Sequence, residues 1–136
     1  MDALNLDLLN AAIDGDLKTV EACLENGANV NCKDEIDWTP LHRAALGGHT
    51  DTASLLISLG ADINIKDCWA GQTPLHWTAD RGHTETAALL ASMGANINSQ
   101  DYGKWTPLHL AALGDHTDTV LLLISNGADS NIQAVG

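Results

Sequence analysis

A four-residue motif, Thr-Pro-Leu-His, recurs along the chain at nearly constant spacing. It begins at Thr39, Thr73 and Thr106, at steps of 34 and 33 residues. A second motif, Gly-Ala-Asn/Asp-x-Asn, keeps this spacing and begins at Gly27, Gly60, Gly94 and Gly127. Two motifs that recur together at a fixed offset indicate four copies of one structural unit, not a single irregular core.

Each unit has the residues of two short helices. The Thr of the first motif is suited to cap a helix N-terminus, and the Pro after it fits the first helical position, where a missing N–H costs nothing. We expect this helix to stop near Gly48 in the second unit and near Gly82 in the third. The second helix has a broad apolar face and should end before Gly60 or Gly94. One such pair cannot bury its apolar stripe alone, so the units must stack.

With a period of about 33 residues and a T-P-L-H-x-A motif, the sequence resembles the ankyrin repeat family. The resemblance covers essentially the whole chain, as one domain over residues 1–136 with approximate repeats 1–33, 34–66, 67–100 and 101–136. It implies an all-α solenoid of stacked helix-turn-helix units with projecting β-hairpin fingers, here at 34–38, 67–72 and 101–105. It also implies that the histidine of each Thr-Pro-Leu-His motif is structural and bridges neighbouring units by hydrogen bonds.

The first and last units differ from the middle two. In the first unit Leu6-Asp7-Leu8-Leu9 replaces the Thr-Pro-Leu-His motif, which gives a more polar opening helix that resembles an N-terminal cap. After the fourth unit only 132–136 remain, and we expect an apolar flank around Leu121 to be bare. Two interpretations stay open for this flank. It is a tolerated exposed end, or it contacts a further repeat, a second copy of the chain or a partner.

Charge and composition narrow the choice of partner. The chain has six Lys and Arg and 18 Asp and Glu, which give a net charge of −12. The resulting electric field repels phosphate backbones and anionic lipid surfaces. We therefore expect no nucleic acid and no membrane as partner, but a protein with a neutral or basic surface. The apolar stretch 120–124 is too short to span a bilayer and the N-terminus lacks a secretory signal. Three cysteines without a C-x-x-C pair fit a reducing compartment, so an intracellular, cytoplasmic location is expected.

No pattern of catalytic or ligand-binding residues stands out. The six histidines are spread as one pair per Thr-Pro-Leu-His unit, without the short spacing of a zinc site. The sequence has no nucleophile elbow and no phosphate-binding loop. Asp34, Asp67 and Asp101 begin the three fingers, where an Asp side chain can accept backbone N–H groups of a tight turn. We therefore expect no enzyme activity, no cofactor and no metal.

The aromatic residues are the most informative about function. Four of the five aromatic side chains fall on the fingers, namely Trp38, Trp69, Tyr102 and Trp105. Exposed Trp and Tyr are enriched at binding hot spots, so this row is a candidate protein-docking strip. For Trp38 and Trp105 the alternative is packing on their own finger and on the helix below. Trp77 is the strongest single candidate, because the matching positions hold Arg43 and Leu110 and no packing rule requires an indole.

The family resemblance implies that a partner binds the concave surface formed by the fingers and the first helices. On this sequence the surface comprises Glu35, Ile36, Trp38, Arg43, Leu46, Trp69, Gln72, Trp77, Arg81, Tyr102, Lys104, Trp105, Leu110 and Leu113. The expected function is a non-catalytic protein-protein interaction module. Two alternatives stay open. One is a structural or self-associating segment of a longer ankyrin array, and the other is a small ankyrin-type kinase inhibitor, which no specific motif supports.

Overall fold

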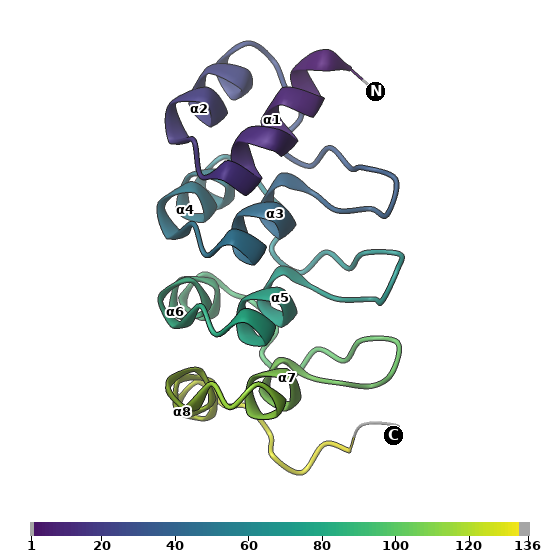
Figure 1. Cartoon of the computed structure of the whole chain (residues 1–136), viewed down its shortest axis with the longest axis vertical. Coiled ribbons are helices and arrows are strands. Elements are labelled where there is room, and N and C mark those ends of the chain that lie inside the picture. Colours follow the sequence, from purple (N-terminus) through teal and green to yellow (C-terminus); the bar gives the residue numbers. More distant parts are fainter. Residues whose placement is uncertain (1, 134–136) are drawn as a thin grey trace.

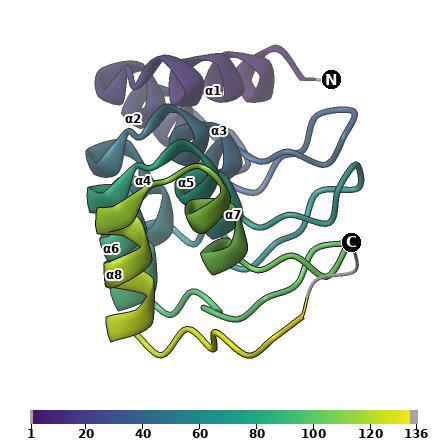
Figure 2. The same ribbon diagram turned by 60° about the horizontal axis from the view of Figure 1, so that its bottom comes forward.

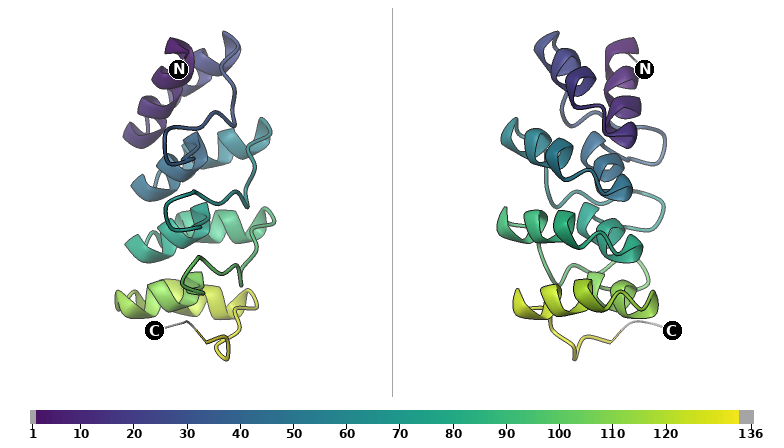
Figure 3. Two further views of the ribbon diagram at one scale, coloured as in Figure 1. Left: turned by 90° about the vertical axis from the view of Figure 1, so that its right-hand side faces the viewer. Right: turned by 60° about the vertical axis from the view of Figure 1, so that its left-hand side comes forward.

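The computed structural model describes residues 2–133, which form four pairs of antiparallel helices stacked in chain order (Figure 1). The helices are α1 (Ala3–Asp14), α2 (Leu17–Glu25), α3 (Pro40–Gly47), α4 (Thr50–Ser58), α5 (Pro74–Arg81), α6 (Thr84–Ser92), α7 (Pro107–Leu113) and α8 (Thr117–Ser125). No strand occurs between residues 2 and 133. The first helices α1, α3, α5 and α7 form one layer and the second helices the other, and three loops project beside the first layer (Figures 1 and 3). The expected all-α solenoid is therefore confirmed.

The Thr-Pro-Leu-His motifs open three of the first helices, as predicted. In α3 the Thr39 hydroxyl accepts the His42 N–H at 3.3 Å, and the Thr39 N–H donates to the His42 Nδ1 at 3.2 Å. Thr73 and Thr106 make the same reciprocal bonds at the start of α5 and α7. Such a capping box satisfies two backbone donors that a helix N-terminus leaves without partners.

Histidines join each repeat to its neighbour at both ends of the first helices. At the start of the helix, the Nε2 groups of His42 and His76 donate to main-chain carbonyls of the next unit at 3.0 and 2.9 Å, and that of His109 donates to the Ile132 carbonyl of its own unit at 2.8 Å. At its end, the Nε2 groups of three turn histidines donate to carbonyls of the preceding unit at 2.8–3.0 Å; these are His49, His83 and His116. Five of the six imidazoles thus bridge repeats, and the bridging role expected for the Thr-Pro-Leu-His histidines is confirmed for His42 and His76.

The turn between paired helices requires glycine for two reasons. Gly48 and Gly82 adopt left-handed φ values of 68° and 71°, which side chains disfavour. A Cβ at Gly48 would also lie 2.6 Å from the His83 ring, and one at Gly82 would lie 2.5 Å from the His116 ring. The fourth unit has Asp115 at this position with φ 58°. Gly114 before it has an ordinary φ of −84°, so the left-handed position of this unit falls on Asp115.

A ladder of asparagines, which the sequence analysis left without a role, also links the units. The Asn31 side-chain oxygen accepts the Asp62 N–H at 2.8 Å, and its amide donates to the Gly60 carbonyl at 3.1 Å. Asn64 and Asn98 repeat both bonds one unit further along. The last position of the second motif is Asn in all four units, and this invariance is the sequence pattern that could have revealed the ladder.

The core is a continuous column of apolar side chains along the stack. Its largest fully buried members are Leu8, Leu9, Leu41, Leu56, Leu75, Leu90, Leu123 and Val20. At the end of the column Leu121 and Ile124 are 60% and 50% exposed, so the expected bare flank of the fourth unit is confirmed. Within residues 2–133, no helix has the length and apolar character needed to cross a bilayer.

Candidate protein-binding surface

Each finger is a tight loop closed around the carboxylate of its first residue. We name residues 34–38, 67–72 and 101–105 the first, second and third finger. The Asp34 Oδ1 accepts the N–H groups of Ile36 and Trp38 at 2.9 and 3.0 Å, and Asp101 does the same in the third finger. The expected role of these aspartates is therefore confirmed. The expected β-hairpins are not formed as strands, because one main-chain bond from the first to the last residue closes each loop.

Bonds between neighbours hold the three fingers in one row (Figure 2). The Cys68 N–H donates to the Ile36 carbonyl at 3.0 Å, and the Tyr102 N–H donates to the Ala70 carbonyl at 2.9 Å. The Gln72 side chain adds a bond to the Asp101 carboxylate at 3.0 Å. Main-chain bonds at the tips fix the spacing of the fingers, so the side chains they carry form one preorganised surface.

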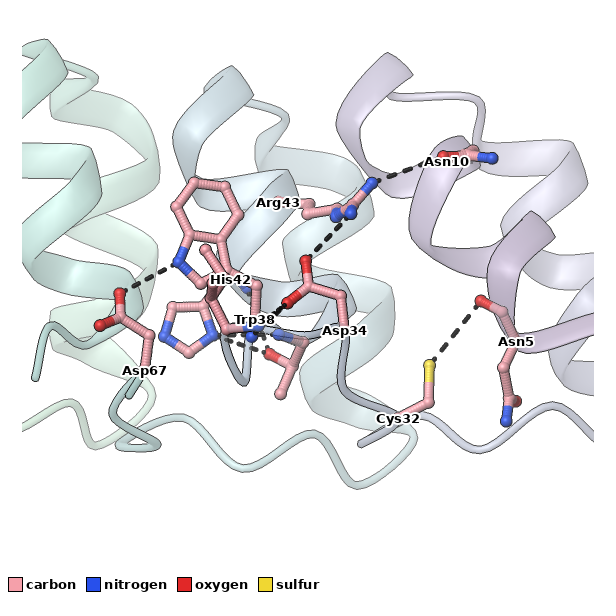
Figure 4. Close-up of polar contacts among 10 residues, drawn as sticks. Asn5, Asn10, Cys32, Asp34, Trp38, His42, Arg43 and Asp67 are labelled. Carbon is pink, nitrogen blue, oxygen red and sulfur yellow. Dashed lines mark hydrogen bonds and ion pairs between the residues drawn. The ribbon is translucent and has the colours of Figure 1, made fainter. Parts of the chain in front are cut away.

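Asp67 is the most connected residue of the row. It is 1% exposed, and its Oδ1 accepts the N–H groups of the loop 70–72 at 2.8–3.4 Å. Its Oδ2 accepts the indole N–H of Trp38 at 3.0 Å and of Trp77 at 3.3 Å (Figure 4 shows the Trp38 bond). Burial raises the pKa of Asp67, but these hydrogen bonds outweigh it, and the pKa lies below its ordinary value. Asp67 is thus a buried anion that joins the first finger, the second finger and α5.

Trp77 does not have the open position that the sequence analysis expected. Its side chain is buried, with 9% of its surface exposed, and it meets the Trp38 ring edge-on at a centroid distance of 5.0 Å. The expectation that no packing contact needs this indole was wrong, because the bond to Asp67 depends on it. The acceptor lies ten residues earlier on a finger, so the helical pattern around Trp77 could not reveal the contact.

Trp38 and Trp105 follow the packing alternative. The Trp38 ring stacks on His42 at 6.2 Å with an interplanar angle of 10°, and the Trp105 ring meets His109 edge-on at 5.6 Å. Both indoles are half-buried at the base of their fingers. Arg43 is also held in place, because its guanidinium donates to Asp34 at 3.0 Å and to Asn10 at 3.4 Å (Figure 4).

Trp69 and Tyr102 are exposed on the fingers, as expected for a protein-docking strip. They are 69% and 68% exposed. The Tyr102 ring lies against Gly71 of the neighbouring finger, since a Cβ on Gly71 would come within 2.5 Å of it. The remaining expected residues divide by exposure: the exposed ones are Glu35, Arg81, Lys104 and Leu113, and the half-buried ones are Ile36, Leu46, Gln72 and Leu110.

Burial shifts the pKa of several histidine and cysteine side chains. Burial lowers the pKa of His42 and His76, so both rings are held neutral, and burial raises the pKa of the Cys32 thiol to about 11. Cys68 is the exposed member of the three free cysteines. No group of three His, Cys, Asp or Glu side chains within 2–133 is placed to hold a metal ion. What the finger row offers is contact area, and its exposed aromatic side chains are Trp69 and Tyr102.

Comparison with known protein families matches this arrangement to one class. A family model described as ankyrin repeats in three copies matches residues 59–134, and a second, described as ankyrin repeats in many copies, matches residues 8–57. The first alone covers more than half of the chain. The chain belongs to the ankyrin repeat family, whose members are generally non-catalytic protein-protein interaction modules.

Individual relatives match over shorter stretches. Human protein phosphatase 1 regulatory subunit 27 is 46% identical over 55 residues, which are 40% of this chain and 36% of that protein. Human ankyrin repeat domain-containing protein 49 is 48% identical over 58 residues, 42% of this chain and 24% of that protein. Mouse 2-5A-dependent ribonuclease is 46% identical over 56 residues, 40% of this chain and 8% of that protein. These alignments span about a third of the relatives or less.

Proposed function

We propose that this chain is a non-catalytic module that holds a partner protein through its fingers and first helices. The exposure of Trp69 and Tyr102 on a row of fingers carries the proposal. Exposed Trp and Tyr side chains supply a large contact area and are enriched at binding hot spots. Because the tips are joined by main-chain bonds, the finger backbones lose little conformational freedom when a partner covers them.

Charge and cysteine chemistry add to the description of the partner and its location. A net charge of −12 favours a partner with a neutral or basic surface over nucleic acid or anionic lipid. Three free thiols fit a reducing compartment, so the proposal places the module inside the cell. One relative's name, a phosphatase regulatory subunit, fits a role in binding another protein.

Affinity capture tests the proposal. The whole chain is immobilised, and the proteins it retains from an extract of its source cells are identified by mass spectrometry. The variant Trp69→Ala plus Tyr102→Ala should lose the specific partner. A matched control is Leu59→Ala plus Met93→Ala, since these apolar residues are 52% and 46% exposed at the ends of the second helices α4 and α6. The same catch on all three chains would contradict the finger surface.

A second candidate is self-association through the end of the stack. Leu121 and Ile124 on α8 are exposed, and light scattering at increasing concentration would detect a dimer that Leu121→Glu abolishes. Continuation of the same stack is less favoured than a dimer. Asp115 carries a side chain where earlier units have a glycine packed beneath the next turn histidine. A further repeat with that histidine does not fit over Asp115 in the same geometry.

A further inference from the structure

The three fingers share their first residue but differ in charge beyond it. Asp34, Asp67 and Asp101 open the loops and hold them closed in the same way. The second position then has Glu35, Cys68 and Tyr102, and the position before the last has Asp37, Gly71 and Lys104. At these two positions the first finger therefore has two negative groups, the second finger has none, and the third finger has one positive group.

No ion pair among residues 2–133 neutralises these three charged groups. The ion pairs formed by residues 2–133 join Arg43 to Asp34 and Arg81 to its neighbour Asp80, so Glu35, Asp37 and Lys104 take no part in them. Two other lysines near the fingers are directed elsewhere. Lys66 donates to the Gln100 carbonyl at 2.8 Å, and Lys33 lines a hollow with Asp2 and Asn31 that Glu35 does not line.

The backbone gives independent support for a role of the end charges. Asp37 and Lys104 have φ values of 62° and 63°, and Gly71 at the matching position has φ 70°. Glycine adopts this left-handed conformation more readily than any other residue, and Lys is disfavoured there. Only the second finger needs glycine for space, because Tyr102 packs on it. A charged side chain kept on a strained backbone is typical of a functional position.

A hollow beside the first finger has room for a long side chain. It measures about 430 Å³ and lies between α1 and the finger, lined by Leu6, Leu9, Asp34, Glu35, Ile36 and Arg43. Its floor is apolar, and Leu6 is 47% exposed there. Arg43 is paired with Asp34, which leaves Glu35 as the free charge at the rim. An apolar floor with an anionic rim fits the aliphatic stem and cationic end of a Lys or Arg side chain.

We infer that the partner is a protein segment that crosses the fingers in one direction, with a basic side chain at the first finger, an apolar group on Trp69 and an acidic side chain at Lys104. This inference rests on the proposed function and adds the order of charges to it. Like charges placed opposite each other oppose binding, so the order fixes the register and direction of the bound segment. The opposite order places a basic group against Lys104 and an acidic group against Glu35.

A display library of random peptides tests the order directly. Three neighbouring units are spaced about 8–10 Å apart, and an extended chain advances ~3.3 Å per residue. Peptides of about 12 residues are therefore long enough to reach all three fingers. Peptides selected on the whole chain should carry basic, apolar and acidic residues in a common order. Their dissociation constants are then measured by fluorescence polarisation on the unaltered chain and on its variants.

The decisive variant exchanges the end charges, Glu35→Lys plus Lys104→Glu, and leaves the net charge at −12. The selected peptides should bind it about tenfold or more weakly, and peptides with reversed charges should regain the loss. The matched control, Lys18→Glu plus Glu21→Lys, makes the same kind of exchange on α2 and should bind like the unaltered chain. Thermal melts confirm that each variant is folded.

The outcomes separate this inference from the proposed function. If the peptides lose affinity for Trp69→Ala plus Tyr102→Ala but bind the exchanged chain unchanged, the charge order is wrong and the finger surface stands. If they are indifferent to both variants, the finger surface is wrong as well. A library that yields no binder, or binders without a common charge order, overturns the inference.

Discussion

The turns and the fingers lie at opposite ends of the first helices. The turns are similar from repeat to repeat, whereas the finger sequences differ. In the turns of the middle repeats, Gly48 and Gly82 each lie beneath the imidazole of the next unit, so geometry and contacts recur from unit to unit. The fingers share an opening Asp but otherwise read Glu-Ile-Asp-Trp, Cys-Trp-Ala-Gly-Gln and Tyr-Gly-Lys-Trp. Positions that contact the next repeat are fixed by packing, and positions that face solvent are free to differ.

Asp67 lies on a finger, yet its position is fixed by packing. Its removal should cause the largest loss in the free energy of unfolding. Asp67→Ala leaves two indole and three backbone N–H groups without their acceptor. A buried donor left without its acceptor costs about 1–3 kcal/mol, and several lose it here, so the loss should exceed about 3 kcal/mol. Urea unfolding followed by tryptophan fluorescence measures the loss. A loss similar to that of an exposed residue would show that Asp67 does not tie the fingers to the helices.

The same residue gives the molecule a specific acid sensitivity. The folded pKa of Asp67 is lowered, so its stabilising contribution is complete above the unfolded value of about 3.9 and is lost as the pH falls through the folded value. In His42 and His76 it is burial that lowers the pKa. The unfolded chain therefore takes up protons at a higher pH than the folded chain does, and stability should begin to fall as the pH drops below about 6.5. Asp67→Asn should weaken the more acidic phase and keep the other, as measured by the urea midpoint against pH.

The turn glycines should tolerate substitution far less than glycines at the ends of the second helices. Gly82→Ala combines left-handed strain with a Cβ 2.5 Å from the His116 ring. We expect a loss of about 2–4 kcal/mol, from strain and overpacking together. Gly60→Ala is the matched control, because Gly60 has φ 102° with nothing within 4 Å of an added Cβ. Equal losses in urea unfolding would mean that the histidine contact plays no part.

The fourth unit allows the opposite experiment. Asp115 has φ 58° at the turn position, and glycine relieves that strain, so Asp115→Gly should stabilise the chain by about 1 kcal/mol. Gly114→Ala should give no comparable gain, since Gly114 has an ordinary φ of −84° and its added Cβ would meet the His116 ring at 2.6 Å. Thermal unfolding of the two variants side by side compares them.

The finger tips should show the smallest effect on stability. Trp69 is 69% exposed, and surface substitutions away from buried contacts usually change stability by less than about 0.5 kcal/mol. Trp69→Ala should therefore unfold like the unaltered chain while its capture of the partner is lost. Trp77→Ala should lose stability instead, because its indole is buried against Asp67 and Trp38. A large stability loss from Trp69→Ala would place that side chain in the fold and not in binding.

The sequence alone predicted the helix pairs, their order and the fingers' opening aspartates. Each of these is local: a Thr that caps, a Pro at the first helical position, or an Asp that accepts N–H groups a few residues away. Recurrence at a fixed step turned these local patterns into a stack. The exposed Trp69 and Tyr102 were also foreseen, because they lie at loop tips with no repeated packing role.

Only the tertiary structure decided which finger-side residues are available to a partner. Trp77 and Arg43 occupy the same position in successive units. The indole of Trp77 is buried against Asp67, and the guanidinium of Arg43 is paired with Asp34. Those partners lie on the fingers, and whether a side chain meets them depends on how the finger folds back over the helix. The asparagine ladder joins residues 29–32 positions apart. Periodicity fixes what each unit is, and contacts between units fix what each side chain does.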